Sequence, residues 1–192
     1  VLNPDGTEAV AELELDPGLS SRNPVIAATA DGGFVVAWED TSGRDGSGVG
    51  IVAQRFDASG APAGDSFVVN EQFSSTQSEV DVIGLEDGRF VIGWRDFVGT
   101  DDLFAQVYSA TGERLDGPIR LAGDGNFNTR SSPELAALPG SNFVAIYVEA
   151  TTNGSADGSG AGILQQIWGT PGDFAPGAAP VVQGLTDNVT FD

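Results

Sequence analysis

The chain has 192 residues, 40% of them hydrophobic, which is enough for one domain with a sizeable core or for a short array of repeats. Its 28 acidic residues outnumber eight basic residues, all of them arginine, and the formal net charge of −20 excludes nucleic acid and anionic membranes as partners. Histidine and cysteine are absent, which excludes disulfides, Ser-His-Asp and Cys-His catalysis, and most zinc sites.

Four short apolar segments, separated by turn residues, form the first recognisable pattern. They are Pro24–Ala28, Phe34–Trp38, Gly50–Phe56 and Ser66–Asn70. The sequence Asp31-Gly32-Gly33 separates the first two. Glycine adopts the positive φ that tight hairpin turns need, and Val, Ile, Phe and Trp favour strands, so the pattern predicts four antiparallel strands.

The same pattern returns twice. The second set of segments is Glu79–Leu85, Phe90–Trp94, Leu103–Tyr108 and Pro118–Leu121, and the third is Glu134–Leu138, Phe143–Val148, Gly162–Trp168 and Pro180–Gln183. Corresponding phenylalanines lie at positions 34, 90 and 143, which are 56 and 53 residues apart. Four strands in about fifty residues is the spacing of a β-propeller blade.

The predicted fold is therefore all-β: a propeller-like array of three four-stranded antiparallel blades plus one extra N-terminal strand. Val1-Leu2-Asn3-Pro4-Asp5-Gly6 matches Arg55-Phe56-Asp57-Ala58-Ser59-Gly60, so the chain is expected to open with the tail of a preceding repeat over residues 1–20. The repeats then span 21–76, 77–129 and 130–183, followed by a linker at 184–192 into a truncated module. A β-sandwich is the alternative.

The combined motif resembles a repeat of very large secreted bacterial proteins of the RTX, or haemolysin-type calcium-binding, group. It consists of Gly33-Phe34-Val35-Val36-Ala37-Trp38-Glu39-Asp40, a loop, and Ala53-Gln54-Arg55-Phe56-Asp57. In that group such repeats often precede cadherin-like modules, whose start residues 180–192 resemble. The resemblance implies an extracellular or cell-surface location and a structural or adhesive role. The glycine-rich nonapeptide that binds calcium in RTX proteins is absent.

Acidic residues at corresponding positions are the first candidates for a binding site. Asp40, Asp96 and Glu149 each follow the aromatic residue of a second strand. They can serve as cation ligands or, alternatively, as acceptors for backbone N–H groups of the following turn. Recurrence in each repeat favours the structural role.

Two glycine-rich loops add further oxygen ligands. Asp45 and Asp157 lie in Asp-Gly-Ser-Gly sequences, and the corresponding loop of the second repeat holds Asp101 and Asp102. Carboxylate and carbonyl oxygens suit Ca²⁺, which is the one cofactor that the sequence suggests. The candidate calcium ligands are Asp40, Asp45, Asp96, Asp101, Asp102 and Asp157. An ordinary long hairpin loop is the alternative.

Three glutamines recur inside apolar third strands: Gln54, Gln106 and Gln166. A buried amide needs hydrogen-bond partners, so we expect these side chains to bind backbone groups between blades, with the lining of a central channel as the alternative.

Large aromatic residues recur at the end of the second strands: Trp38, Trp94 and Tyr147. We expect them in the core, with stacking on sugar rings as the alternative.

The sequence predicts a non-catalytic structural or adhesive domain of a secreted bacterial surface or matrix protein, which contacts proteins or glycans. The alternatives are an accessory subunit that completes a larger assembly and a calcium-dependent lectin. Expected partners are copies of this chain, other protein chains, or glycans, with neither nucleic acid binding nor membrane insertion. No pair of carboxylates stands out for glycoside hydrolysis, and no catalytic residue is predicted.

Overall fold

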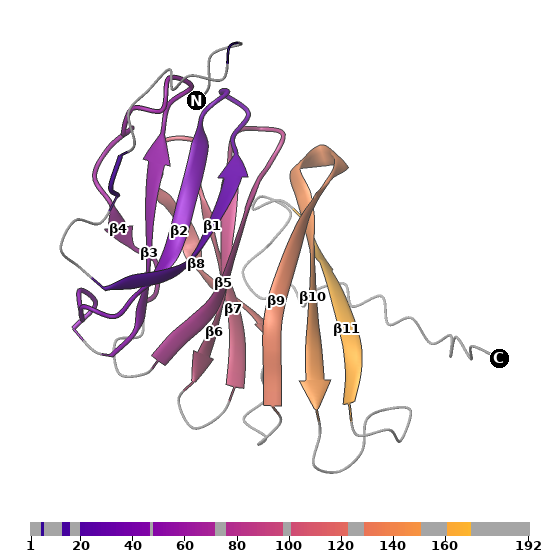
Figure 1. Cartoon of the computed structure of the whole chain (residues 1–192). Coiled ribbons are helices and arrows are strands. Elements are labelled where there is room, and N and C mark those ends of the chain that lie inside the picture. Colours follow the sequence, from indigo (N-terminus) through magenta and orange to yellow (C-terminus); the bar gives the residue numbers. More distant parts are fainter. Residues whose placement is uncertain are drawn as a thin grey trace.

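The computed structural model describes residue 5 and residues 13–15, 20–46, 48–71, 76–97, 101–122, 129–150 and 161–169 (Figure 1). Within these residues the regular elements are eleven strands and one short 3-10 turn, so the all-β prediction is confirmed. None of the described residues belongs to a helix long and apolar enough to cross a membrane.

Three antiparallel sheets contain all of these strands, each joined to its sequence neighbour. Sheet 1 holds β1 (Ser21–Ala28), β2 (Phe34–Asp40), β3 (Gly50–Phe56) and β4 (Phe67–Val68). Sheet 2 holds β5 (Thr76–Gly84), β6 (Phe90–Phe97), β7 (Asp101–Tyr108) and β8 (Arg114–Ala122). Sheet 3 holds β9 (Thr129–Leu138), β10 (Asn142–Ala150) and β11 (Ala161–Trp168), with the turn Pro139–Ser141 between β9 and β10.

Each described strand overlaps one of the predicted segments. The predicted twelfth strand, Pro180–Gln183, lies outside the described residues, as does most of the extra strand expected near the N-terminus. Four-stranded antiparallel sheets are therefore seen twice, and the third sheet is described over three strands.

The first strand of each sheet begins earlier than the sequence indicated, because a β-bulge interrupts it. The pairing register shifts between Arg22 and Val25 in β1 and between Ser78 and Asp81 in β5. Asn23 and Glu79 stand at the two bulges with φ of 52° and 54°. A bulge leaves one residue unpaired and turns its neighbours to a new direction, which the apolar pattern alone does not reveal.

The sheets pack face to face, and the first strands β1, β5 and β9 lie next to each other. We call the face of a sheet that carries Phe34, Phe90 or Phe143 its front, and the opposite face its back. β5 also packs across β2 and β3, and β9 packs across β6 and β7. The front of one sheet therefore covers the back of the preceding sheet, and the sheets fan out as in a propeller (Figure 1).

Both faces of a middle sheet are consequently apolar. The front of sheet 2 places Phe90, Ile92 and Trp94 in one core cluster with Val35 and Ala37 from the back of sheet 1. The back of sheet 2 contributes Val91, Leu103 and Ala105 to a second cluster, which contains Phe143 and Tyr147 of sheet 3. The core prediction for the three aromatic residues holds, since Trp38, Trp94 and Tyr147 are all buried.

Close approach of the first strands depends on a residue without a side chain. A Cβ atom added to Gly84 would collide with the carbonyl oxygen of Ala28, which is backbone and cannot move aside. By contrast, nothing lies within 4 Å of a Cβ added to Gly117 on β8.

We predict that Gly84→Ala lowers the free energy of unfolding by about 1–3 kcal/mol, because β1 and β5 must separate to admit the methyl group. Gly117→Ala is the matched control and should change stability by less than about 0.5 kcal/mol. Urea denaturation of both variants measures the difference. Equal stabilities would show that β1 and β5 do not approach each other this closely.

Candidate functional site

Charged side chains gather at one end of the sheets, where β2, β6 and β10 finish. Arg22 Nε lies 2.7 Å from Glu39 Oε2 within sheet 1. Glu39 Oε1 accepts a hydrogen bond of 2.9 Å from the backbone N–H of Glu79 at the bulge of β5. Glu79 Oε1 in turn lies 2.8 Å from Arg95 Nη1. A buried carboxylate of sheet 1 thus holds the bulge of sheet 2.

The same chain of contacts continues into sheet 3. Arg95 Nε donates to Asp101 Oδ1 over 2.8 Å. The backbone carbonyl of Asp101 accepts a 3.3 Å hydrogen bond from Arg130 Nη1, and Arg130 Nη2 lies 2.6 Å from Glu149 Oε1. We call this set the charged belt. It consists of Arg22, Glu39, Glu79, Arg95, Asp101, Arg130 and Glu149.

Burial makes the charged belt sensitive to loss of the partners of its buried members. Glu39 is 2% exposed and Arg130 is 3% exposed. Burial disfavours ionisation of Glu39, but hydrogen bonds from Arg22, Asn23 and the Glu79 N–H outweigh it and hold the pKa of Glu39 below its ordinary value. Burial likewise opposes the charge on Arg95, and the carboxylates of Asp101 and Glu79 more than compensate and raise the pKa of Arg95. A buried charge that keeps such partners is tolerated, whereas one left alone is strongly destabilising.

Asp81, on β5 facing sheet 3, has a pKa shifted in the opposite direction from that of Glu39. Burial raises the pKa of Asp81, although its carboxylate accepts hydrogen bonds from the backbone N–H groups of Leu135 and Val82. The bond from Leu135 connects β9 to β5, so Asp81 takes part in the contact between sheets 2 and 3.

The predicted calcium ligands of the first repeat each contact a protein group. Asp40 Oδ1 accepts from the Ser42 N–H over 2.6 Å, and its Oδ2 lies 3.8 Å from Arg44 Nε. Asp45 Oδ2 accepts from Asn70 Nδ2 over 3.0 Å. Asp40 thus accepts a turn N–H, as the structural alternative expected.

The predicted calcium ligands of the second repeat also contact protein groups. Asp96 Oδ1 accepts a 3.2 Å bond from Gln77 Nε2, and Asp102 Oδ2 lies 2.7 Å from Arg120 Nη2. Asp101 belongs to the charged belt. Among the described residues no three acidic side chains come together as a metal site, and Asp157 lies outside these residues. Calcium binding stays a prediction.

Two acidic residues line one hollow on the front of sheet 2. Its lining consists of Glu71, Trp94, Asp96, Phe104 and Pro118, and its volume is about 80 Å³. The rings of Trp94 and Phe104 stack with centroids 6.0 Å apart. Asp96 is 2% exposed, whereas Glu71 is half-exposed and lies 2.8 Å from Arg114 Nη1. An aromatic floor with two acids beside it suits a sugar ring.

Sequence reasoning considered Asp96 and Trp94 separately and missed Glu71. Glu71 lies between β4 and β5 and belongs to none of the recurring segments. It reaches the hollow only because sheet 1 packs against the front of sheet 2.

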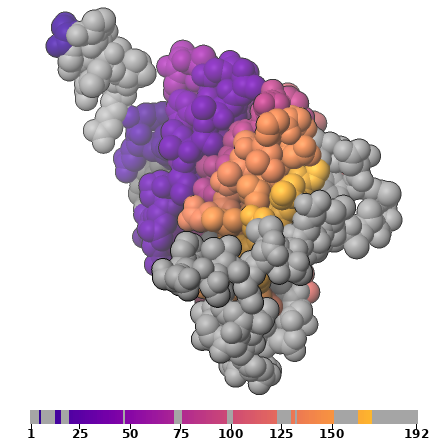
Figure 2. Space-filling view, turned by 90° about the vertical axis from the view of Figure 1, so that its right-hand side faces the viewer, coloured from indigo at the N-terminus to yellow at the C-terminus, as the bar shows by residue number. Residues whose placement is uncertain are grey.

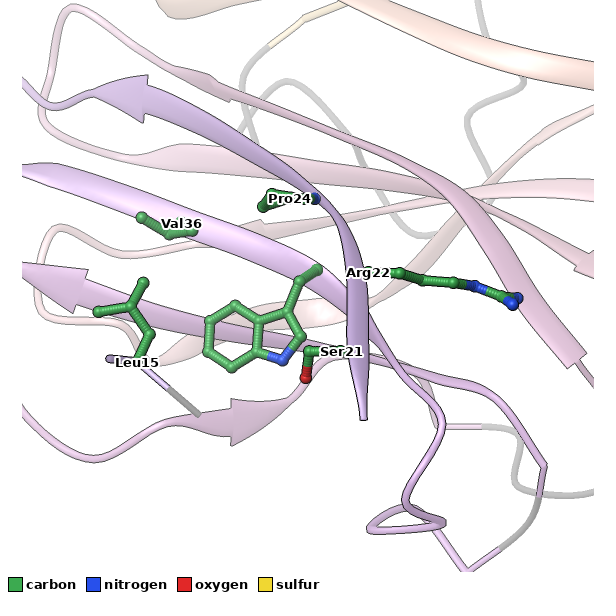
Figure 3. A pocket seen from close by; sticks show the side chains of 6 residues that line it. Leu15, Ser21, Arg22, Pro24 and Val36 are labelled. Carbon is green, nitrogen blue, oxygen red and sulfur yellow. The ribbon is translucent and has the colours of Figure 1, made fainter. Parts of the chain in front are cut away.

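A second hollow of about 130 Å³ lies on the front of sheet 1 (Figure 3). It is lined mostly by apolar groups of Leu15, Pro24, Val36 and Trp38, with Ser21 and Arg22 at its edge. The Arg22 side chain extends away from the hollow in Figure 3 and pairs with Glu39. None of these lining residues therefore directs a charge into the hollow.

The recurring glutamines bind backbone groups, but within their own sheet. Gln54 Nε2 donates to the Gly64 carbonyl over 3.2 Å, and Gln106 Nε2 donates to the Leu115 carbonyl over 3.1 Å. The expectation of contacts between blades was wrong for these two, because their side chains reach sideways to the chain that follows their strand. Gln166 lies on β11, whose predicted outer neighbour is outside the described residues.

Comparison with known proteins found no matching family model and no matching curated protein. Solved structures do match, at low sequence identity. The Hadza microbial sialidase Hz136 has 11% identity and a TM-score of 0.54 over 77% of this chain and 35% of the sialidase. The GH93 α-L-arabinofuranosidase of Fusarium graminearum, in complex with arabinobiose, has 12% identity and a TM-score of 0.51 over 83% of this chain and 51% of that enzyme.

An endo-arabinase from Bacteroides thetaiotaomicron VPI-5482 also matches, with 12% identity and a TM-score of 0.49 over 88% of this chain and 63% of the enzyme. The chain therefore spans less than two thirds of the length of each of these three proteins. The two higher scores support the propeller-like, all-β fold.

These matches correct the predicted function. The chain shares its fold with parts of a sialidase and an arabinofuranosidase, which contradicts the expected structural or adhesive function together with its accessory-subunit and lectin alternatives. The reason is that a recurring apolar pattern reports blade packing, which binding and catalytic propellers share. Membership of the RTX group and an extracellular location stay predictions.

We predict that Glu39 stabilises the protein at neutral pH and not in acid. Its pKa in the folded chain lies below the ordinary value of 4.5, so its contribution is complete above that pH and disappears as the pH falls below it. Glu39→Gln should therefore be clearly less stable than the wild type at neutral pH, and the difference should shrink in acid. Urea denaturation at both pH values tests this, with the exposed Glu113→Gln as control. A difference that is constant with pH would contradict it.

Proposed function

We propose that this chain forms three blades of a glycosidase-like propeller and acts on carbohydrate at the hollow between Glu71 and Asp96. The single observation that supports it most is the likeness to the sialidase and the arabinofuranosidase, with TM-scores above 0.5 over more than three quarters of the chain. The hollow adds two carboxylates and two stacked aromatic rings at one place.

Two carboxyl groups are what glycoside hydrolysis requires. One protonates the oxygen of the leaving sugar, and the other acts as a base on water or as a nucleophile at the anomeric carbon. Glu71 and Asp96 are the two described acids that line this hollow. The half-buried Phe104 offers an apolar surface to a sugar ring, and the buried Trp94 stacks against Phe104.

The size of the hollow limits how the substrate binds. Its volume of about 80 Å³ is well below the range of about 300–1,000 Å³ that is usual for ligand sites. We therefore propose that it receives one end of a glycan, such as a terminal sugar residue, and not an extended stretch of polymer.

The charge of the protein distinguishes between the two kinds of sugar that the matched enzymes suggest. A sialidase acts on sialic acid, which is anionic, whereas arabinose is neutral. A surface with a net charge of −20 repels an anionic ligand and leaves a neutral one unaffected. The proposal is therefore a glycosidase for neutral sugars, with arabinofuranosides as the first class to test.

We predict measurable release of the leaving group from aryl α-L-arabinofuranosides, and loss of at least about 100-fold in Asp96→Asn and in Glu71→Gln, because each change removes one of the two carboxyl groups. Glu113→Gln, a change at an exposed residue that does not line the hollow, is the matched control and should keep full activity. Thermal melting of each variant ensures that a folded protein is compared.

The same assay should be run with sialosides and with a panel of neutral aryl glycosides. Faster cleavage of sialosides would contradict the charge argument. Absence of turnover on every substrate, in a folded wild-type protein, would overturn the proposal of a glycosidase.

A further inference from the structure

Neighbouring sheets pack against each other at two places, between sheets 1 and 2 and between sheets 2 and 3. We call these two contacts joints, and they are built alike. The first strand of one sheet lies across the back of the preceding sheet: β5 on sheet 1, and β9 on sheet 2. Val82 of β5 and Leu135 of β9 occupy corresponding positions and pack into the two core clusters. Opposite Leu135 stands Gly93, where an added Cβ would lie 3.1 Å from the leucine side chain.

One of the two surfaces that form such a joint, the front of a first strand, is exposed in sheet 1. Ile26 of β1 corresponds to Val82 and Leu135, because these three residues pair with Val36, Ile92 and Ala145 of the second strands. Val82 is 4% exposed, whereas Ile26 is 65% exposed. β1 is thus a first strand without a sheet beneath it among the described residues.

The other surface that forms a joint, the back of a sheet, is exposed in sheet 3. Ile146, Val148, Ile163 and Ile167 are all exposed, and Ile163 reaches 78%. Ile163 corresponds to Ile51 and Leu103, each of which is fully buried in a joint. Figure 2, which faces the right-hand side of the molecule, shows atoms of β9 to β11 on the open surface.

We infer that two copies of this chain associate head to tail, with β1 of one copy lying across the back of sheet 3 of the other. Both surfaces belong to the same chain, and each matches one side of the joints already formed within it. The contact repeats an interface that the chain builds twice, which favours a second copy of this chain as its occupant.

Side chains at the two surfaces complement each other. Leu103 lies in one cluster with Tyr147, and these residues correspond to Ile163 and Trp38. The 130 Å³ hollow beside Trp38 therefore lies where Ile163 of the second copy would arrive (Figure 3). Ile146 is larger than Ala37 and Gly93 at the corresponding positions, so the two copies sit further apart than sheets within the chain, and the contact is weaker.

A polar contact also has its counterpart. Asp81 Oδ2 accepts a 2.6 Å hydrogen bond from the backbone N–H of Leu135. Glu134 corresponds to Asp81 and is exposed, and Ile26 corresponds to Leu135. The Glu134 carboxylate can therefore accept from the backbone N–H of Ile26 in the second copy.

The interface joins two different surfaces, so copies close into a ring or extend into a chain of copies. The net charge of −20 on each copy opposes this association. Salt screens that repulsion, because the Debye length falls from about 10 Å at 0.1 M to about 3 Å at 1 M ionic strength. Association should therefore strengthen with sodium chloride, which also strengthens the apolar contact.

The test is sedimentation equilibrium of the wild-type protein over a range of concentrations in low and in about 1 M sodium chloride. We expect multiples of the 19.7 kDa chain mass, with tighter association in high salt. Ile163→Asp and Ile26→Asp should each weaken association at least about tenfold, because each places a charge in an apolar contact. Leu164→Asp is the matched control: Leu164 is exposed and adjacent to Ile163, but it faces the front of the sheet.

A mixture of the two variants gives a decisive second measurement. In an equimolar mixture, the intact sheet 3 of Ile26→Asp meets the intact β1 of Ile163→Asp, so mixed pairs should form where neither variant associates alone. Circular dichroism of each variant checks that its strands are retained. A wild-type protein that stays monomeric in high salt, or variants that associate as well as Leu164→Asp, would overturn the inference. None of these outcomes depends on glycosidase activity.

Discussion

Burial of both faces of a β-sheet is the constraint on which the rest of this structure depends. A single antiparallel sheet can leave one face in water, but here β2 and β6 carry apolar residues on both faces. Each sheet must therefore be covered twice, and the first strand of the next sheet supplies one cover. Gly84 and Gly93 show how close this contact is, since an added Cβ at either would meet the adjoining strand. The fan of sheets follows from that single requirement.

The charged belt connects the sheets at the end where β2, β6 and β10 finish. Strands that finish at one edge leave backbone groups and charged side chains close together, and a bulge makes the backbone irregular there. Glu39 uses one carboxylate to bind Arg22 and the backbone N–H of Glu79 at the bulge, which joins two sheets. Arg130 of sheet 3 donates to the backbone carbonyl of Asp101 in sheet 2, which extends the belt to sheet 3. Asp101, one of the predicted calcium ligands, belongs to this belt through its carboxylate contact with Arg95.

The hollow between Glu71 and Asp96 illustrates how function can arise at a joint without a motif of its own. Trp94 is a core residue in the sense that the sequence predicted, yet one side of it lines this hollow. Asp96 recurs with the repeat, and Glu71 does not. A site of this kind is specific to one joint, even though the strands around it are repeated, and the glycosidase proposal depends on that asymmetry.

The sequence by itself determined the all-β class, the approximate position of each described strand, and the burial of Trp38, Trp94 and Tyr147. These follow from local rules, because strand preference, turn glycines and apolar periodicity act over a few residues. Only the tertiary structure decided which sheet faces cover each other, which carboxylates are paired with arginine, and that Glu71 and Asp96 line one hollow. Those facts depend on contacts between residues far apart in the chain. The functional prediction failed for the same reason: a recurring pattern describes how blades pack, while chemistry depends on which non-recurring side chains a joint brings together.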